Sequence, residues 1–316
     1  MITTHFLQYS ITTQAFGSLA AAIGHTPLFH LQHLGQTLAP GVQLYAKAEW
    51  FNPGGSIKDR PALNIIITAL AQGQLGQGKR LLDSTSGNMG IAYATLGAAM
   101  GIPVTLVIPG NANHERMGIL RALGAELVIS DPLEGSDGAI LVARQMASAE
   151  PERYFYANQY DNPANWLAHY QTTGPELVEQ TGGKITHLVA GLGTSGTLMG
   201  TGRYLRDYNP AVRLVGVQPD APFHGLEGLK HMPSAYKPGI YDPALPDAIV
   251  EVQTEGAYQM ARRLAREEGL FVGISAAAAA QAALQVAASL EHGVVVAIFP
   301  DAGYKYLSES FWEAGL

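Results

Sequence analysis

Cysteine is absent from this sequence of 316 residues. That absence excludes disulfide bonds, iron–sulfur clusters, thiolate zinc sites and cysteine nucleophiles. The ten histidines form no H-E-x-x-H pattern, so the sequence also lacks the commonest histidine metal motif. We therefore expect neither thiol chemistry nor a bound metal.

Charged residues are scarce as well. They make up 14% of the chain, against about 25% in a typical protein, while 47% of the residues are hydrophobic. Lys and Arg together number 19 and Asp and Glu 26, which gives a net charge of −7. An acidic chain does not suit a nucleic-acid backbone, because binding phosphates requires a basic face. The composition instead favours a large buried core, with further surface that a second copy of the chain can cover.

No Lys, Arg, Asp or Glu occurs in the first 46 residues, so neither a signal-peptide n-region nor an Arg-rich transit peptide is visible. Two further uncharged stretches, 84–114 and 269–290, are interrupted by glycine, proline or polar residues. Each is typical of a buried strand and a buried helix rather than of a membrane span. We expect a cytoplasmic protein with no membrane contact.

Short β-rich runs alternate with longer helical runs from about residue 42 onward. Strands are expected at 81–83, 103–108, 126–129, 187–190, 213–217, 270–274 and 294–299. Helices are expected at 62–70, 91–100, 115–123, 196–207, 255–268 and 276–290. This alternation predicts an α/β fold of two doubly wound domains, with mostly parallel sheets covered on both faces. A polar break at 149–152 favours a smaller domain at 42–150 and a larger one made of 1–41 and 151–316.

Three glycine-rich turns carry the candidate chemistry, because ligands of doubly wound sheets bind at the carboxyl ends of strands. The first turn, residues 84–90, reads Ser-Thr-Ser-Gly-Asn-Met-Gly and lies between an expected strand and an expected helix. Backbone N–H groups at such a helix start suit a carboxylate or another anion. Ordinary helix capping by Ser, Thr or Asn explains the same residues.

The second turn, residues 191–197, reads Gly-Leu-Gly-Thr-Ser-Gly-Thr and satisfies G-x-G-x-x-G. A dinucleotide site also needs an acidic residue about 20 positions later, at the end of the next strand. Gln218 stands there instead, and Asp220 is too far along. The hydroxyls of the turn suit a single phosphate monoester better. A nicotinamide-dependent dehydrogenase remains an alternative.

The third turn spans residues 52–60 and reads Asn-Pro-Gly-Gly-Ser-Ile-Lys-Asp-Arg. It holds Lys58 at the start of an expected helix, where the positive end of the helix dipole disfavours a cation. A lysine that must be neutral part of the time, such as one that forms a Schiff base, suits this position. A solvated lysine paired with Asp59 is the alternative.

These segments together resemble the cysteine synthase (O-acetylserine sulfhydrylase) family, pyridoxal-phosphate enzymes of the tryptophan-synthase-β fold, also called fold type II. The third turn resembles the family's cofactor-lysine segment. Residues 85–90 resemble its carboxylate loop, and residues 193–197 its phosphate loop. Matches in the same order lie at 24–28, 159, 172–176 and 273–275. The resemblance covers about residues 18–307, and residues 226–245 are more similar to the B-type enzymes than to the A-type.

The resemblance implies a role for each cofactor-binding residue. Lys58 would join the aldehyde of pyridoxal 5'-phosphate and later remove the α-proton of the substrate. Asn88 would hydrogen-bond the ring oxygen of the cofactor, and Ser275 would face the pyridine nitrogen. A hydroxyl at that nitrogen favours β-elimination and addition over transamination. The cofactor phosphate would be bound by Gly193, Thr194, Ser195, Gly196 and Thr197.

The substrate carboxylate, by the same resemblance, would be bound by Thr85, Ser86, Gly87, Met89 and Gln159. Met89 replaces the usual Thr of this loop and keeps only its backbone donor. Ala276 and Ala277 replace the usual Ser-Gly after Ser275. Asp301, after the last strand, is placed either near the cofactor ring or as an ordinary turn carboxylate.

The implied reaction is β-replacement, in which O-acetyl-L-serine loses acetate to give an aminoacrylate and sulfide then adds to form L-cysteine. Thiosulfate as the sulfur donor and O-phosphoserine as the substrate stay open, because Lys230 stands where B-type relatives often carry Arg. Lys230 as a surface lysine is the alternative. The rival enzymes are a serine/threonine dehydratase and a cystathionine β-synthase. A non-catalytic module that captures a partner's carboxyl terminus is the remaining rival, since A-type relatives bind the tail of serine acetyltransferase. A homodimer is also expected.

Overall fold

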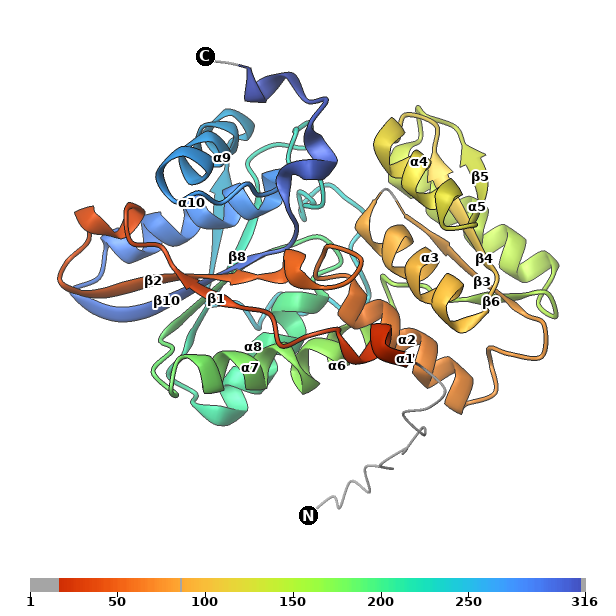
Figure 1. Cartoon of the computed structure of the whole chain (residues 1–316), viewed down its shortest axis with the longest axis horizontal. Coiled ribbons are helices and arrows are strands. Elements are labelled where there is room, and N and C mark those ends of the chain that lie inside the picture. Colours follow the sequence, from red (N-terminus) through yellow and green to blue (C-terminus); the bar gives the residue numbers. More distant parts are fainter. Residues whose placement is uncertain (1–16, 86, 314–316) are drawn as a thin grey trace.

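Two β-sheets organise the chain, which a computed structural model describes at residues 17–85 and 87–313. The larger sheet has the strand order β1-β2-β10-β7-β8-β9, and the smaller one the order β5-β4-β3-β6. Every neighbouring pair is parallel except β1 and β2. The two sheets with their helices form two units that lie side by side (Figure 1). The predicted α/β class with mostly parallel sheets is confirmed.

The strands are short, as is usual in such folds. Those of the larger sheet are β1 (Leu28–His30), β2 (Gly41–Ala48), β7 (His187–Gly191), β8 (Arg213–Pro219), β9 (Ala248–Val252) and β10 (His292–Phe299). Those of the smaller sheet are β3 (Arg80–Ser84), β4 (Val104–Pro109), β5 (Glu126–Ser130) and β6 (Tyr154–Tyr156).

Helices connect the strands. Those before β7 are α1 (Gly17–Ala21), α2 (Asp59–Ala71), α3 (Asn88–Met100), α4 (His114–Ala122), α5 (Gly135–Ala149), α6 (Pro163–Gln171) and α7 (Thr173–Gln180). Those after it are α8 (Gly196–Tyr208), α9 (Thr254–Glu267) and α10 (Ile274–Ala288). Short 3-10 helices are η1 (Leu34–Thr37), η2 (Glu49–Phe51), η3 (Gly303–Tyr306) and η4 (Ser310–Trp312).

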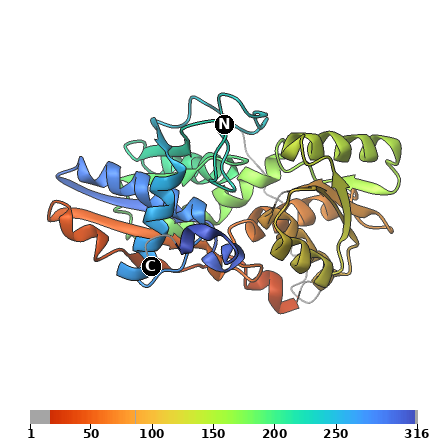
Figure 2. The same ribbon diagram turned by 90° about the horizontal axis from the view of Figure 1, so that it is seen from above.

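Helices cover both faces of each sheet (Figures 1 and 2). In β10, Val295, Ala297 and Phe299 belong to the core shared with α9 and α10, whereas Val296 and Ile298 belong to the core shared with α7 and α8. Successive side chains of a strand point to opposite faces, so a strand buried on both faces reads as a continuous apolar run. This explains why 294–299 is apolar throughout.

Local sequence sets several helix ends. The Asn162 side chain accepts a hydrogen bond from the Ala164 N–H at 3.0 Å, and Pro163 starts α6 with the backbone angle that a helix needs. At the other end of α3, Gly101 adopts the left-handed conformation with φ 70°. Glycine adopts this conformation without the cost that a Cβ brings, which is why α3 stops there.

The expected strand at 270–274 is wrong. Among the described residues only Val272 of this run pairs, in an isolated bridge with Ala302, and Ile274 already begins α10. The run is apolar because Val272 and Ile274 are buried in the core of the larger unit. A short apolar run does not by itself distinguish a strand from the buried start of a helix.

The expected domain bounds differ from sheet membership at both ends. Strand β2 pairs with β10 along its whole length, so residues 41–48 lie in the larger sheet, while β6, after residue 150, pairs with β3 of the smaller sheet. Parallel strands that pair can lie far apart along the chain. Their membership of a sheet is therefore not marked by any linker-like segment in the sequence. Whether the smaller unit moves as a domain stays a prediction. No helix within 17–85 and 87–313 is long and apolar enough to cross a membrane.

Candidate active site

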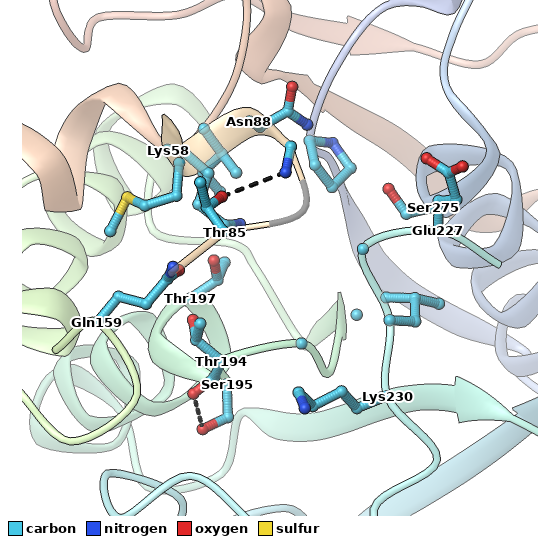
Figure 3. Close-up of a pocket in the computed structure, with 18 of the residues that line it drawn as sticks. Lys58, Thr85, Asn88, Gln159, Thr194, Ser195, Thr197, Glu227, Lys230 and Ser275 are labelled. Carbon is cyan, nitrogen blue, oxygen red and sulfur yellow. Dashed lines mark hydrogen bonds between the residues drawn. The ribbon is translucent and has the colours of Figure 1, made fainter. Parts of the chain in front are cut away.

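A pocket lies between the two units, at the carboxyl ends of β3, β7 and β10. It brings together most of the residues singled out from the sequence (Figure 3). Those that line it are Lys58, Thr85, Gly87, Asn88, Met89, Gln159, Gly193, Thr194, Ser195, Thr197, Lys230 and Ser275. Gly196 does not line the pocket, although it is the first residue of α8. Ser86 lies outside the described residues.

Lys58 directly precedes α2, where the turn before it is held against the end of β10. The Ile57 N–H donates to the Pro300 carbonyl at 2.8 Å, and Ser56 forms a bridge with Asp301. Burial lowers the pKa of the Lys58 amine, an effect that the carboxylates of Asp301 and Glu49 oppose. The amine therefore has part of the neutral character that a nucleophilic lysine needs.

The phosphate loop, residues 193–197, connects β7 to α8. Met199 is the first residue of α8 whose N–H bonds back along the helix, to the Ser195 carbonyl at 3.0 Å. The N–H groups of the first turn come before it and have no acceptor within the helix. Ser195 has φ 67°, a left-handed conformation that, next to helical residues, turns successive N–H groups toward one point. An anion is the natural partner of this arrangement.

Side chains around the phosphate loop hold its hydroxyls. The Asn165 amide donates to Thr194 Oγ1 at 3.2 Å, and Thr197 Oγ1 lies 3.4 Å from Nε2 of His169. Burial lowers the pKa of His169 well below its ordinary value, so its ring is neutral. Its Nδ1 lies 2.9 Å from Thr173 Oγ1. These two contacts explain why a histidine stands at position 169, which no sequence motif contains.

The carboxylate loop follows β3 and leads into α3. Thr85 Oγ1 accepts hydrogen bonds from the N–H groups of Gly87 and Gly90, each at 3.2 Å. The Gln159 side chain is buried and donates to the Ser84 carbonyl at 2.7 Å. Met89 is 2% exposed and packs in the hydrophobic core of the smaller unit, so methionine here adds packing where a hydroxyl is usual.

Ser275 lies in the first turn of α10, on the side of the pocket opposite Gln159 (Figure 3). A Cβ added to Gly228 would lie 3.8 Å from Ser275 Oγ. The loop at residues 227–230, called the 228 loop below, therefore borders this hydroxyl closely. Ala276 and Ala277 are fully buried in the core beneath it. Their small side chains let α10 pack against the larger sheet.

The pocket is also lined by Arg116, Tyr160, Glu227 and Tyr306, which the sequence did not single out because none of them lies in a recognised motif. Arg116 of α4 forms an ion pair with Glu227, and its guanidinium lies 5.0 Å from the Tyr306 ring centroid. Lys230 lies 3.5 Å from Asp137 of α5 and 5.1 Å from the Tyr160 ring centroid. With a side chain only 12% exposed, Lys230 is part of the pocket rather than a solvated surface lysine.

The residues present fit pyridoxal phosphate. The free N–H groups and hydroxyls of the phosphate loop suit a phosphate, the Lys58 amine suits an aldehyde, and the Ser275 hydroxyl suits a ring nitrogen. In the described part of the chain, no group of three or more His, Asp or Glu side chains is placed to hold a metal.

Comparison with known proteins agrees with this chemistry. Residues 19–301 match the family described as pyridoxal-phosphate dependent enzyme. The chain is 51% identical to a cysteine synthase of Aquifex aeolicus over 92% of this chain and 90% of that protein. It is 41% identical to cysteine synthase B of Pseudomonas aeruginosa, over 95% and 99% respectively.

Solved structures give the same result. The crystal structure of cysteine synthase from Entamoeba histolytica matches with a TM-score of 0.90 at 33% identity, covering 94% of this chain and 91% of that one. An O-acetylserine dependent cystathionine beta-synthase from Helicobacter pylori matches with a TM-score of 0.88 at 34% identity, covering 94% and 98%. This chain therefore belongs to the family of pyridoxal-phosphate dependent enzymes.

Proposed function

We propose that this enzyme makes L-cysteine from O-acetyl-L-serine and sulfide by β-replacement. The observation that carries the proposal is the convergence in one pocket of the Lys58 amine, an anion-binding loop at the start of α8 and a second one at the start of α3. The two curated relatives described above, each named a cysteine synthase, support the same activity.

Bound pyridoxal phosphate supplies the electron sink for the charge left when a proton leaves the substrate α-carbon. Lys58 Nζ is the base that takes this proton, and burial, which lowers the pKa of the amine, favours the neutral form that can accept it. The same amine returns the proton after acetate has left the β-carbon and sulfide has bonded to it. Asn88 binds the ring oxygen of the cofactor, and residues 193–197 bind its phosphate.

The substrate carboxylate is bound by the carboxylate loop. We assign this role to the backbone N–H of Met89, to Thr85 and Gly87, and to Gln159, which lines the same pocket. Ser86 belongs to the proposed loop by its position in the sequence. Two anion sites in one pocket, one for a phosphate and one for a carboxylate, suit an amino acid held beside the cofactor.

Lys230, whose backbone N–H donates to the Leu192 carbonyl at 2.7 Å beside the phosphate loop, places a positive charge in the pocket. A cation there suits the extra negative charge of thiosulfate or of the phosphate in O-phosphoserine. We propose Lys230 as the residue that decides how well either compound replaces sulfide or O-acetylserine.

The test is to incubate purified enzyme and pyridoxal phosphate with O-acetylserine and sulfide. We expect cysteine to form, and Lys58→Ala to lower its rate by at least about 10³-fold because the base is lost. Lys184→Ala, which removes an exposed lysine, serves as the control and should retain full activity.

Three outcomes would contradict the proposal. Oxoacid release from serine or threonine without cysteine would indicate a dehydratase. Thioether formation with homocysteine but none with sulfide would indicate a cystathionine β-synthase. Binding of a nicotinamide cofactor, with activity unaffected by Lys58→Ala, would indicate a dehydrogenase.

Assembly, motion and location remain predictions. We propose that the enzyme is a homodimer, that the unit built on the smaller sheet closes over bound substrate to exclude water, and that the protein is cytoplasmic. Capture of a serine acetyltransferase tail in the same pocket is a further prediction from the family resemblance.

A further inference from the structure

The Asn88 side chain lies between a cation and a carboxylate. Its Oδ1 accepts a hydrogen bond from Lys305 Nζ at 2.7 Å, and its Nδ2 donates to Asp301 Oδ2 at 2.7 Å. An ammonium only donates and a carboxylate only accepts, so one orientation of the amide satisfies both neighbours. The flipped amide would put its N–H groups against Lys305 and its oxygen against Asp301. The two charges thus select the orientation.

Asp301 is held firmly in this position. It is fully buried, and Oδ2 also accepts a hydrogen bond from the Tyr306 hydroxyl at 2.9 Å. Its backbone carbonyl accepts from the Gly273 N–H at 3.0 Å, two residues before Ser275. The carboxylate that holds Asn88 is therefore anchored to the segment that carries the Ser275 hydroxyl.

Lys305 connects Asn88 to the lysine segment. Besides Asn88, its Nζ donates to the carbonyls of Gly54 at 3.3 Å and Gly55 at 3.2 Å. These carbonyls belong to the turn that carries Lys58. One ammonium thus sets the position of the Asn88 amide relative to the segment bearing Lys58, although the two segments belong to different elements of the chain.

We propose that Lys305 and Asp301 are positioning residues that hold the Asn88 amide with its nitrogen end available to the ring oxygen of the bound cofactor. Of the described residues only Asp301 accepts from Nδ2, so the second N–H of that nitrogen remains for the cofactor. A donated hydrogen bond stabilises an ionised ring oxygen, whereas the oxygen of a flipped amide would repel it. The inference rests on the proposed contact between Asn88 and the ring oxygen.

The experiment is a double-mutant cycle on the purified holoenzyme, read by the dissociation constant of pyridoxal phosphate and by the visible absorption spectrum of the bound cofactor. Lys305→Met should weaken cofactor binding by about tenfold, because it removes a charged hydrogen bond to Asn88. The spectrum should shift toward shorter wavelength as the ring oxygen loses its donor. Lys305→Arg keeps a cation with N–H donors and should restore both values to within about threefold of wild type.

The coupling decides between a positioning role and a general loss of stability. If Lys305 acts through Asn88, then Lys305→Met made in an Asn88→Ala background should weaken cofactor binding by less than about threefold. Lys184→Met, at an exposed lysine, is the matched control and should change neither readout. If Lys305→Met does not fold, Lys305→Gln carries the same cycle without the charge.

Two results would overturn the inference, and they differ in what they leave standing. Additive effects of Lys305→Met and Asn88→Ala would remove the positioning role and leave the proposed function intact. An Asn88→Ala enzyme with unchanged cofactor affinity and spectrum would show that the contact assigned to Asn88 is itself wrong.

Discussion

Gly193 lies where the phosphate loop passes the 228 loop. A Cβ at this position would come within 2.3 Å of the Gly228 carbonyl oxygen, closer than any real Cβ contact. The obstacle is backbone, so relief requires one of the two loops to move. Both loops line the pocket. The absence of a side chain at Gly193 therefore lets the two loops approach closely enough to form the proposed phosphate site.

We predict that Gly193→Ala weakens pyridoxal phosphate binding and lowers the free energy of unfolding by about 1–3 kcal/mol, the usual cost of an overpacked site. Denaturant unfolding and cofactor titration measure the two effects. Gly118→Ala in α4 is the matched control, because its added Cβ meets nothing within 4 Å. That control should be neutral or stabilise by about 0.5–1 kcal/mol. Wild-type affinity and stability in Gly193→Ala would contradict the prediction.

The sequence predicts individual residues of the candidate site best where they lie in local motifs. Lys58, Asn88 and the phosphate loop were predicted because each lies in a short contiguous motif whose neighbours determine its backbone. Lys305 was not, because its three acceptors lie more than 200 residues earlier in the chain. The sequence places Asp301 in a turn after the last strand, but that position does not reveal that its carboxylate is buried and hydrogen-bonded to Asn88.

Four elements meet at a buried ion-pair cluster formed by Lys47 of β2, Glu49 of η2, Arg60 of α2 and Glu176 of α7. Glu176 lies 2.6 Å from both Lys47 Nζ and Arg60 Nη1, and Arg60 Nε lies 2.8 Å from Glu49. Burial alone would raise the pKa of Glu176, but the hydrogen bonds and charges of Arg60 and Lys47 lower it to about 2. The cluster joins the helix that follows Lys58 to the larger sheet.

We predict that Glu176→Gln destabilises the fold by about 3–5 kcal/mol near neutral pH, since it leaves two buried cations with one carboxylate. The low pKa of Glu176 means that its contribution is present above about pH 4.5 and is lost as the pH falls toward 2. Denaturant unfolding at pH 7 and at pH 3 measures this loss. Glu179→Gln, an exposed position of the same helix, should stay within about 0.5 kcal/mol of wild type. An equally small effect of Glu176→Gln would refute the prediction.

Elements with a clear period and clear ends were predicted closely. The helix expected at 196–207 is α8 at 196–208, and the strand expected at 213–217 is β8 at 213–219. Both lie between turn residues that mark their limits. The strand predicted at 270–274 is wrong because buried strands and the starts of buried helices are both apolar, so the apolar run did not distinguish them.

At the scale of the whole molecule, Asp83 is a buried carboxylate with no cation among the groups that shift its pKa. It is fully buried at the end of β3, and burial raises its pKa to about 7 despite hydrogen bonds from the N–H groups of Ser84 and Gln159. An acid whose pKa is raised on folding stabilises the fold at low pH, and this stabilisation is lost as the pH rises toward 7.

We predict that the stability of wild-type protein falls by up to about 1.4 kcal/mol per pH unit between pH 5 and 7 because of this group. Asp83→Asn lacks that contribution. Its free energy of unfolding should therefore rise relative to that of wild type as the pH increases from 5 to 7. Denaturant unfolding at pH 5, 6 and 7 gives the difference directly. A difference that does not change with pH would contradict the raised pKa.

The sequence by itself determined the α/β class, the family and the two loops proposed to bind anions, because these depend on residues that are neighbours along the chain. Only the tertiary structure decided which strands share a sheet, that β2 belongs with β10, and that Arg60 meets Glu176 and Asn88 meets Asp301. Such contacts join residues more than 100 positions apart. They form only when packing brings distant parts of the chain together, and no local pattern records that approach.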